Sequence, residues 1–288
     1  MTQKVLITGA ASGLGRALAL RFAKIGAQIC IADINDEGSQ ETLELVKKAG
    51  GCGWIYHLDV RSESQWNELR SEVEQRWKGI DVVINNAGVA TGDRIEAGEW
   101  SWWDWVIDIN IKGVALGCRT FTPMMKQQGS GYFINVASLA GLMKAPAMGS
   151  YNTTKAAVVA LSETLHFELK PYGIGTTALC PGFFRTNLDK GMRTSDPQMH
   201  KFVDKVFEAS ELNADDIADA AFNAMQKNQV ICNPHPTGRR AYFVKKYLPW
   251  LFRIQMDKFA KALKSRDPNI KTPLQRAVAE ERGEASAK

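Results

Sequence analysis

Short runs of apolar and β-branched residues recur along the chain, and residues at helical spacing separate them. Such runs, bounded by turn residues, are typical of buried strands. They lie at 4–8, 28–32, 54–58, 81–84, 132–137, 174–180 and 230–232. Because these strands alternate with helices, the pattern predicts an α/β fold: a Rossmann-like, doubly wound, parallel seven-stranded sheet with helices on both faces. Ligands of such sheets bind at the carboxyl ends of the strands.

The turn after the first run is rich in glycine. Residues 9–15 hold three glycines and stand directly before the helical pattern of 16–24. In a strand–turn–helix context, glycines let the backbone approach a pyrophosphate, whose charge is stabilised by the helix N-terminus. The candidate cofactor contacts in this turn are its glycines, Gly9, Gly13 and Gly15.

Asp33 ends the second strand, about 20 residues after the glycine turn, where an acidic residue can bind the adenosine ribose hydroxyls. Its carboxylate would repel a 2′-phosphate, and residues 34–37 contain no Lys or Arg. The position therefore favours NAD over NADP. Alternatively, Asp33 is the N-cap of the next helix, a role that Asp36 could equally fill.

Two further turns follow strands that we expect at the same edge. Asp59, with Val60 beside it, could contact adenine or cap the helix expected at 62–77. Asn85-Asn86-Ala87-Gly88 suits a turn lining the cofactor crevice, although Asn-rich turns are also common on geometric grounds alone.

Tyr151 and Lys155 stand four residues apart in a helical segment, so their side chains share one face. Ser138 follows the strand at 132–137, and its hydroxyl can face them. An isolated phenol, with a pKa of about 10, is a poor base near neutrality. A nearby cation lowers that pKa, and we expect Lys155 to do so for proton transfer on an alcohol or carbonyl. The same spacing also occurs by chance.

Asn110 is the one amide in a helical stretch at 106–116. A buried amide must be hydrogen-bonded, so Asn110 is either a structural plug or part of a proton relay. The tryptophans at 100–105 are better explained by packing or a subunit interface than by a ligand cage. Residues 187–212 are expected to be irregular and, with their spaced apolar residues, to form a substrate lid.

Composition narrows the function classes. With 288 residues, 45% of them hydrophobic, the chain can bury a large core. No apolar run approaches the roughly 18 residues of a membrane span, and no signal peptide precedes the first strand, so we expect a cytoplasmic protein. The five cysteines form no C-x-x-C pair and the four histidines lack metal-ligand spacing. We therefore expect no disulfide and no metal.

Charge divides the chain into a body at 1–237 and an extension at 238–288. Residues 238–266 carry nine Lys/Arg and one acid, whereas the body has a net charge of −3. A mildly acidic body with a basic tail does not indicate a nucleic-acid-binding protein.

The extension contains an amphipathic pattern at 250–264. Its apolar stripe, with basic residues on the other side, consists of Phe252, Met256, Phe259 and Leu263. We expect the stripe to pack on the body, the lid or a partner subunit. The alternative is an interfacial helix that makes weak contact with an anionic membrane surface through 241–264.

Taken in order from Lys4 to Cys232, these motifs resemble the short-chain dehydrogenase/reductase family in its single-domain form. They are Thr8-Gly9-x-x-x-Gly13-x-Gly15, the 85–88 turn, Asn110, Ser138, Tyr151 with Lys155, and Pro181-Gly182. The resemblance implies a homodimer or homotetramer and a catalytic set of Ser138, Tyr151, Lys155 and Asn110. It also implies a set of cofactor contacts, namely Gly9, Ser12, Gly13, Leu14, Gly15, Asp33, Asp59, Val60, Asn86, Ala87, Gly88, Tyr151, Lys155, Pro181, Gly182 and Thr186.

The resemblance implies a role for each catalytic residue. Tyr151 would be the general acid/base, Ser138 would hold the substrate oxygen, and Lys155 would bind the nicotinamide ribose. Asn110 would hold a water that links Lys155 to solvent. We therefore expect an NAD-dependent oxidoreductase acting on a fairly apolar secondary alcohol or ketone. A non-catalytic NAD-binding sensor or scaffold is the alternative.

Overall fold

The computed structural model describes residues 2–185, 188, 191–208 and 210–264. The chain forms two compact units, Met1–Arg240 and Ala241–Lys288. The first unit contains the sheet and every predicted cofactor and catalytic residue. The second unit is described over 241–264 and is treated by itself below.

The sheet of the first unit has seven strands, all parallel, in the order β3-β2-β1-β4-β5-β6-β7. Their bounds are β1 Lys4–Thr8, β2 Gln28–Asp33, β3 Cys52–His57, β4 Val82–Asn85, β5 Gly131–Val136, β6 Ile174–Leu179 and β7 Ile231–Cys232. The predicted doubly wound, seven-stranded parallel sheet is confirmed.

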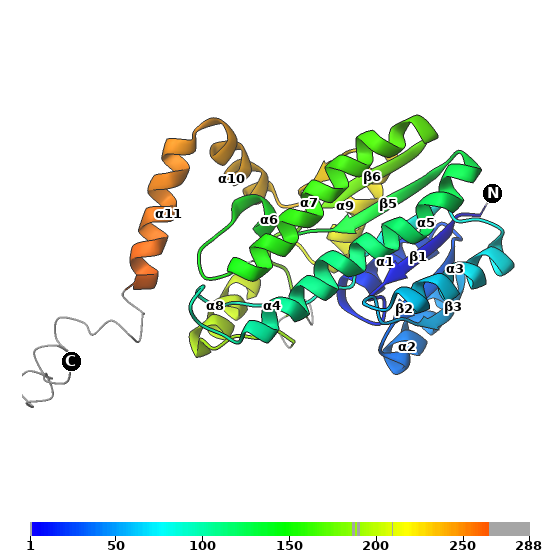
Figure 1. The fold of residues 1–288 in the computed structure, drawn as a ribbon, viewed down its shortest axis with the longest axis horizontal. Helices are drawn as coiled ribbons and strands as arrows, with labels where there is room; N and C mark the ends of the chain where they lie inside the picture. Colours follow the sequence, from blue (N-terminus) through cyan, green and yellow to red (C-terminus); the bar gives the residue numbers. More distant parts are fainter. Residues whose placement is uncertain (1, 186–187, 189–190, 209, 265–288) are drawn as a thin grey trace, which may run out of the picture. The chain divides into compact units, whose positions relative to one another are not determined.

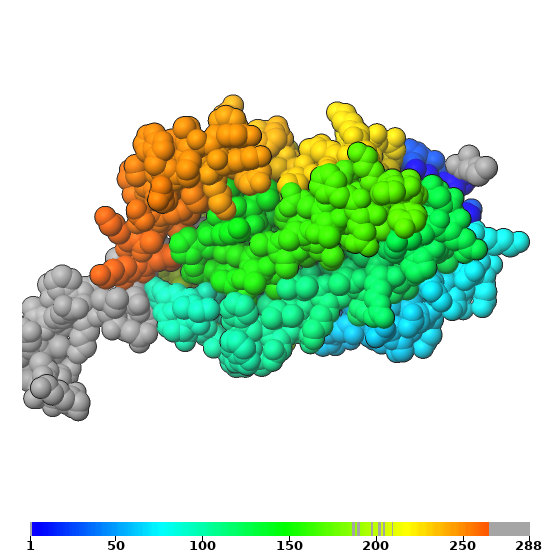
Figure 2. Space-filling view, turned by 45° about the horizontal axis from the view of Figure 1, so that its top comes forward, coloured from blue at the N-terminus to red at the C-terminus, as the bar shows by residue number. Residues whose placement is uncertain are grey.

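Helices cover both faces of this sheet (Figure 1). The helices are α1 Gly13–Ala23, α2 Asp36–Lys48, α3 Glu63–Trp77, α4 Trp100–Ile107, α5 Val114–Gln128, α6 Leu139–Met143, α7 Gly149–Leu169, α8 Pro197–Glu208 and α9 Ala214–Gln226, with a π-helical segment at Asp108–Gly113 and a 3₁₀ turn at Lys170–Tyr172. On one face α1 packs against α2 and α9; on the other α3 packs against α5. Helix α5 packs on β4 and β5, and α7 packs on β5 and β6; both helices are green in Figure 2.

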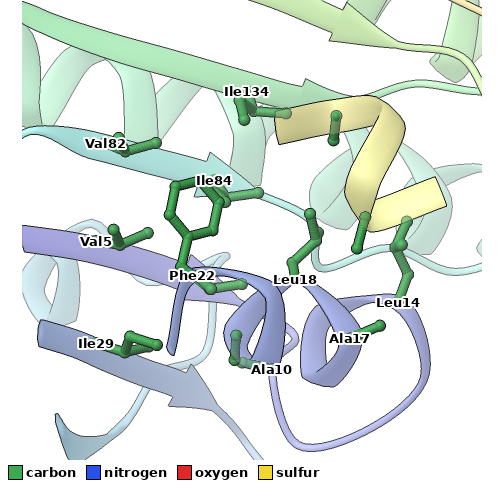
Figure 3. Packing of buried hydrophobic residues seen from close by; sticks show 14 of the residues in the cluster. Val5, Ala10, Leu14, Ala17, Leu18, Phe22, Ile29, Val82, Ile84 and Ile134 are labelled. Atoms are coloured by element: carbon green, nitrogen blue, oxygen red, sulfur yellow. The ribbon is translucent and has the colours of Figure 1, made fainter. Parts of the chain in front are cut away.

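A core cluster lies between the sheet and α1 (Figure 3). Leu18 and Phe22 of α1 are fully buried, as are Val5, Ile29 and Ile84 of three adjacent strands. This continuous apolar packing follows from strands that are buried on both faces. It holds the carboxyl ends of the strands, and therefore the turns that follow them, in fixed positions.

The lid was expected to be irregular, and this expectation was wrong over Pro197–Glu208, which forms α8. Met199 and Val203 lie four residues apart and are both buried, so they share the inner face of this helix. Pro197 stands at its first position, where the missing N–H of proline costs nothing.

The second unit contains the end of α10 (Pro236–Tyr247) and all of α11 (Pro249–Lys264), as expected for a helical C-terminal extension. Within the described part of the chain, no helix is both long and apolar enough to cross a membrane.

Candidate active site

A crevice is expected where the order of the strands reverses, between β1 and β4. Asn86, directly after β4, donates from Nδ2 to the carbonyls of Thr8 (2.9 Å) and Gly9 (3.1 Å). The backbone N–H groups of Asn86 and Ala87 both donate to Thr8 Oγ1, at 3.0 Å each. These bonds tie the glycine turn to the 85–88 turn, so that both line one edge.

The glycine turn fits a pyrophosphate. Gly9 and Gly13 have φ of +65° and +53°, a backbone region that other residues rarely adopt. A Cβ added to Gly15 would lie 2.1 Å from the Gly9 carbonyl oxygen. The side chain of Ser12, the N-cap of α1, makes no capping hydrogen bond, and the first turn of α1 has no acidic residue. The first N–H groups of α1 can therefore donate to an anion.

Asp33 lies beside this turn at the end of β2. Its Oδ2 accepts from the Ala11 N–H (2.9 Å) and its Oδ1 from the Asn35 N–H (3.0 Å). These two bonds fix the carboxylate and leave it further acceptor capacity for ribose hydroxyls. The alternative assignment as a helix cap does not hold, because Asn35 caps α2 by accepting from the Gly38 N–H.

The remaining predicted cofactor contacts lie along the same edge. Asp59 is held by Arg61 (2.6 Å), and this bond lowers the pKa of its carboxyl despite partial burial. Ser62, rather than Asp59, caps α3. Val60 is buried and its carbonyl accepts from the Trp66 indole. Thr186 lies outside the described residues.

Ser138 and Tyr151 come together beyond β5. Ser138 caps α6, its Oγ accepting from the Ala140 N–H (3.1 Å). Tyr151 lies in the first turn of α7 and is 7% exposed. Burial raises the pKa of the Tyr151 phenol to about 12, and a hydrogen bond with the Ser138 side chain acts in the opposite direction. At neutral pH Tyr151 is therefore a phenol whose hydroxyl interacts with Ser138.

Lys155 lies on the same helix, and its ammonium is buried. Its Nζ donates to the Val136 carbonyl (2.9 Å) and lies 5.8 Å from the centre of the Tyr151 ring. Burial lowers the pKa of Lys155 to about 8, which still leaves it mostly charged at pH 7. The expected lowering of the Tyr151 pKa by Lys155 is not observed here, where burial and Ser138 set that pKa.

Burial of the Lys155 charge carries a stability cost that a variant should reveal. The pKa of Lys155 falls from 10.5 in the unfolded chain to about 8 in the fold, so the cost is complete below pH 8 and absent above pH 10.5. Lys155→Met should therefore raise the free energy of unfolding at pH 7 by roughly 1–2 kcal/mol, after loss of the bond to Val136. Urea unfolding at pH 7 and pH 10 measures this gain.

The gain should shrink at pH 10, because the native lysine is then largely neutral. Lys47→Met, at an exposed position on α2, is the matched control and should give no gain at either pH. A Lys155→Met protein less stable than the wild type at pH 7 would show that the buried ammonium stabilises the fold.

Asn110 lies in the π-helical segment between α4 and α5 and is fully buried. Its Oδ1 accepts from the Val89 N–H, and its Nδ2 donates to the Val89 carbonyl (both 2.9 Å) and to Thr154 Oγ1 (3.2 Å). A Cβ added to Gly88 would lie 3.2 Å from both Asn110 Oδ1 and Lys155 Nζ. The amide is thus fixed structurally and faces the same small space as Lys155, and π-helical turns are frequent at functional sites.

An apolar cluster lies against Tyr151. It consists of Ala90, Met148, Tyr151, Met192, Met199 and Val203, with Ala140, Ala147, Phe183, Leu188 and Phe207 packed on it. The 192–196 segment is held to the chain after β4: the Gly92 N–H donates to the Arg193 carbonyl (3.1 Å), and Asp93 Oδ1 accepts from Ser195 Oγ (2.6 Å). Methionine side chains from the 192–203 part of the chain therefore pack in one cluster with the phenol.

His235 was missed by sequence reasoning, which considered the histidines only as metal ligands. It follows β7, is 7% exposed, and its Nδ1 accepts from the Gly182 N–H (3.0 Å). The Pro181 carbonyl in turn accepts from the Leu139 N–H (2.7 Å). His235 therefore holds the Pro181-Gly182 loop beside Ser138. A polar residue after the last parallel strand was the signal available in the sequence.

We expect His235→Ala to weaken NAD binding about fivefold, because the loop loses a buried hydrogen bond worth about 1 kcal/mol. Burial lowers the pKa of His235, with the neighbouring Arg239 acting in the same direction and a Phe183 backbone hydrogen bond opposing them. Protonation would set an N–H against the Gly182 N–H, so NAD affinity should also fall at acid pH, below the usual histidine pKa. Isothermal titration with NAD between pH 5 and 8 tests this.

His235→Asn is the matched variant, because its Oδ1 can replace Nδ1 as an acceptor but does not titrate. It should bind NAD nearly as well as the wild type and lose the acid dependence. If the wild type and His235→Ala bound NAD with equal affinity at every pH, His235 would have no role in the cofactor site.

The parallel sheet, glycine turn and hydroxyl–phenol–ammonium group define a dinucleotide-binding oxidoreductase. The short chain dehydrogenase family matches residues 3–197, and the chain belongs to this family. It is 33% identical over 259 residues to the probable oxidoreductase EphD of Mycobacterium tuberculosis, with 86% of this chain but only 44% of that protein covered. It is 32% identical over 204 residues to epidermal retinol dehydrogenase 2 of Mus musculus, covering 69% of this chain and 66% of that one.

A solved structure supports the same family and also the fold. The short chain dehydrogenase/reductase of Burkholderia phymatum, in complex with NAD, superposes with a TM-score of 0.80 at 30% identity. The match covers 87% of this chain and 95% of that one. The fold and the family of this chain are thereby established.

Proposed function

We propose that this chain is an NAD-dependent alcohol dehydrogenase/ketone reductase acting on a fairly apolar secondary alcohol or ketone. The proposal rests on the surroundings of Tyr151. Its hydroxyl interacts with Ser138, and its side chain packs in an apolar cluster with residues of α8. A phenol placed in this way can exchange a proton with a substrate oxygen from which water is excluded.

In oxidation, Tyr151 as phenolate takes the hydroxyl proton of the substrate while the carbinol carbon loses a hydride; in reduction, the phenol returns the proton. Ser138 donates a hydrogen bond to the substrate oxygen as negative charge develops there. With NAD bound, Lys155 would hold the nicotinamide ribose, and Asn110 would hold a water that links Lys155 to solvent. NAD, when bound, supplies a hydride acceptor at C4. The glycine turn, Asp33 and the 85–88 turn would hold it.

The lining of the lid supports an apolar substrate. Met192, Met199 and Val203 face Tyr151 in one cluster, and methionine side chains adapt to apolar ligands of irregular shape. Epidermal retinol dehydrogenase 2, by its name, acts on retinol, which is an apolar alcohol although a primary one.

The experiment is NADH and NADPH production across secondary alcohols from short polar to long-chain and steroid-like. We expect NADH-linked turnover that increases with the apolar size of the substrate. Turnover only on short polar alcohols would contradict the apolar pocket. NAD binding without turnover on any alcohol or ketone would favour the alternative, a non-catalytic sensor or scaffold.

We also propose a homodimer or homotetramer. Large apolar side chains outside the site remain exposed, including Trp100 of α4, stacked on Trp103, and Phe167 of α7. A partner subunit would cover such side chains.

A further inference from the structure

The turn between α10 and α11 exposes a group of large apolar side chains. We name these residues the elbow face: Phe243, Tyr247, Leu248, Trp250 and Ile254. They are between 38% and 59% exposed and make up five of the eleven large apolar side chains that are exposed in the described part of the chain. All five fall within twelve residues of sequence, so this exposure is concentrated rather than scattered.

The backbone around the elbow face is ordered. The Phe243 and Tyr247 rings are 4.7 Å apart on one side of α10. The Leu248 N–H donates to the Val244 carbonyl (2.8 Å), and the Phe252 N–H donates to the Leu248 carbonyl (3.2 Å). The helical hydrogen bonding therefore continues almost through the turn, which joins the two helices in Figure 1. The aromatic rings project from a defined scaffold.

The exposed face of α11 differs from the stripe expected to make contacts. The stripe residues Phe252, Met256, Phe259 and Leu263 are half-buried. By the helical period of 3.6 residues, Trp250 and Ile254 lie on the opposite side. That side also carries a basic face: Arg253, Lys258, Lys261 and Lys264. The exposed side of α11 thus combines apolar anchors with positive charge, and α11 has no fully buried residue.

The charge of this region indicates what it binds. Residues 241–264 contain six Lys/Arg and a single acid, Asp257, so their net charge is +5. The Lys246 ammonium lies 5.4 Å from the Tyr247 ring centre, within the range of a cation–π contact. The complementary partner is an extended anionic surface with an apolar layer beneath it.

We propose that the elbow face and the basic face form a peripheral docking surface for an anionic lipid bilayer. Trp and Tyr rings lie favourably at the headgroup level, aliphatic side chains enter the acyl boundary, and Lys/Arg attract anionic headgroups. Leu248 and Ile254 favour a bilayer over a nucleic acid, because aliphatic side chains offer bases no stacking surface. Docking uses none of the catalytic residues and is independent of the proposed reaction.

The test is co-sedimentation of the full chain with phosphatidylcholine vesicles, with and without about 30% phosphatidylglycerol. We expect at least tenfold stronger binding to the anionic vesicles, largely lost in about 0.5 M salt. The triple variant Arg253→Gln/Lys258→Gln/Lys261→Gln should reduce binding at least tenfold. Trp250→Ser/Ile254→Ser should reduce it severalfold and make the remaining binding more sensitive to salt.

Matched controls change the same side-chain types in the first unit. Lys24→Gln/Lys47→Gln/Lys48→Gln removes three exposed charges, and Trp100→Ser/Phe167→Ser removes two exposed apolar groups. Both should bind vesicles like the wild type. The charge control and the variants within 241–264 should retain the wild-type melting temperature, because their substituted side chains are exposed.

Four results would overturn the proposal. One is equal binding to neutral and anionic vesicles, and a second is equal loss in the control variants. The third is wild-type binding to a DNA duplex but not to vesicles. If Trp250→Ser/Ile254→Ser lowers the mass measured by light scattering while vesicle binding is absent, the occupant is a second copy of this chain and the bilayer proposal fails.

Discussion

Tyr151→Phe should lower kcat by about 10²–10⁴-fold, the usual contribution of a general acid–base group. The ring is 7% exposed within the apolar cluster, and phenylalanine fills the same volume without the hydroxyl. Stability and NAD affinity should therefore remain close to those of the wild type. Steady-state rates in both directions, together with NAD titration, measure the effect.

The pH dependence of the same variant sharpens this prediction. Burial raises the pKa of Tyr151 to about 12, opposed by the hydrogen bond with Ser138, so the phenolate needed for oxidation is scarce at pH 7. The rate of alcohol oxidation should rise with pH and that of ketone reduction should not. In Tyr151→Phe the residual oxidation rate should lose this rise.

Tyr132→Phe is the matched control, because its hydroxyl contacts Thr177 Oγ1 (2.8 Å) on the neighbouring strand, away from the site. It should keep wild-type kcat. Physiological activity that survived Tyr151→Phe would show that another group transfers the proton.

Asp33→Ala should lower kcat/KM for NAD by about 10- to 100-fold, the value of charge-assisted hydrogen bonds to two ribose hydroxyls. The same change should raise kcat/KM for NADP, because it removes the charge that would repel a 2′-phosphate. Nearby Arg16 is already engaged with Glu41 (2.8 Å) and the Ala11 carbonyl (2.6 Å), so NADP should improve without becoming as good a cofactor as NAD is for the wild type.

Asp33→Ala also leaves the Ala11 and Asn35 N–H groups without their acceptor, so Asp33→Asn is the companion variant. Asp33→Asn keeps an acceptor oxygen but removes the charge. It should therefore distinguish the loss of charge repulsion toward NADP from the loss of the hydrogen bonds that hold the turn. Asp36→Ala, at an exposed carboxylate that pairs with His57, should leave the ratio of NAD to NADP turnover unchanged. A wild-type enzyme that prefers NADPH would contradict the role of Asp33.

Local sequence determined the strands and most helices, because burial on both sides of a parallel sheet requires continuous apolar runs. It also determined the order of the motifs along the chain. The glycine turn, Asp33 and the Tyr151–Lys155 spacing each carry their geometry within a few residues. In a parallel sheet the carboxyl ends of all strands lie at one edge, so the sequence was sufficient to predict that these motifs meet.

Tertiary packing decided what those groups experience. The pKa of Tyr151 depends on burial under α8, whose helical form was missed because its inner face rests on only a few spaced apolar residues. Whether Asn110 is a structural plug or part of a proton relay depends on the hydrogen-bond partners of its amide. Those partners, Val89 and Thr154, belong to other parts of the chain. His235 is joined to Gly182 across 53 residues, and no local pattern reports such a bond.

In the extension, too, the sequence determined some properties and the tertiary structure decided others. The sequence by itself determined a basic, amphipathic helix, because periodicity and charge are local properties of α11. Which of its two faces is half-buried and which is exposed depends on the surroundings of the helix, and only the tertiary structure decided that Trp250 and Ile254 are the exposed ones. The burial and the hydrogen-bond partners of a side chain are set by distant parts of the chain, whereas the apolar periodicity of a helix is set by residues that are neighbours in sequence.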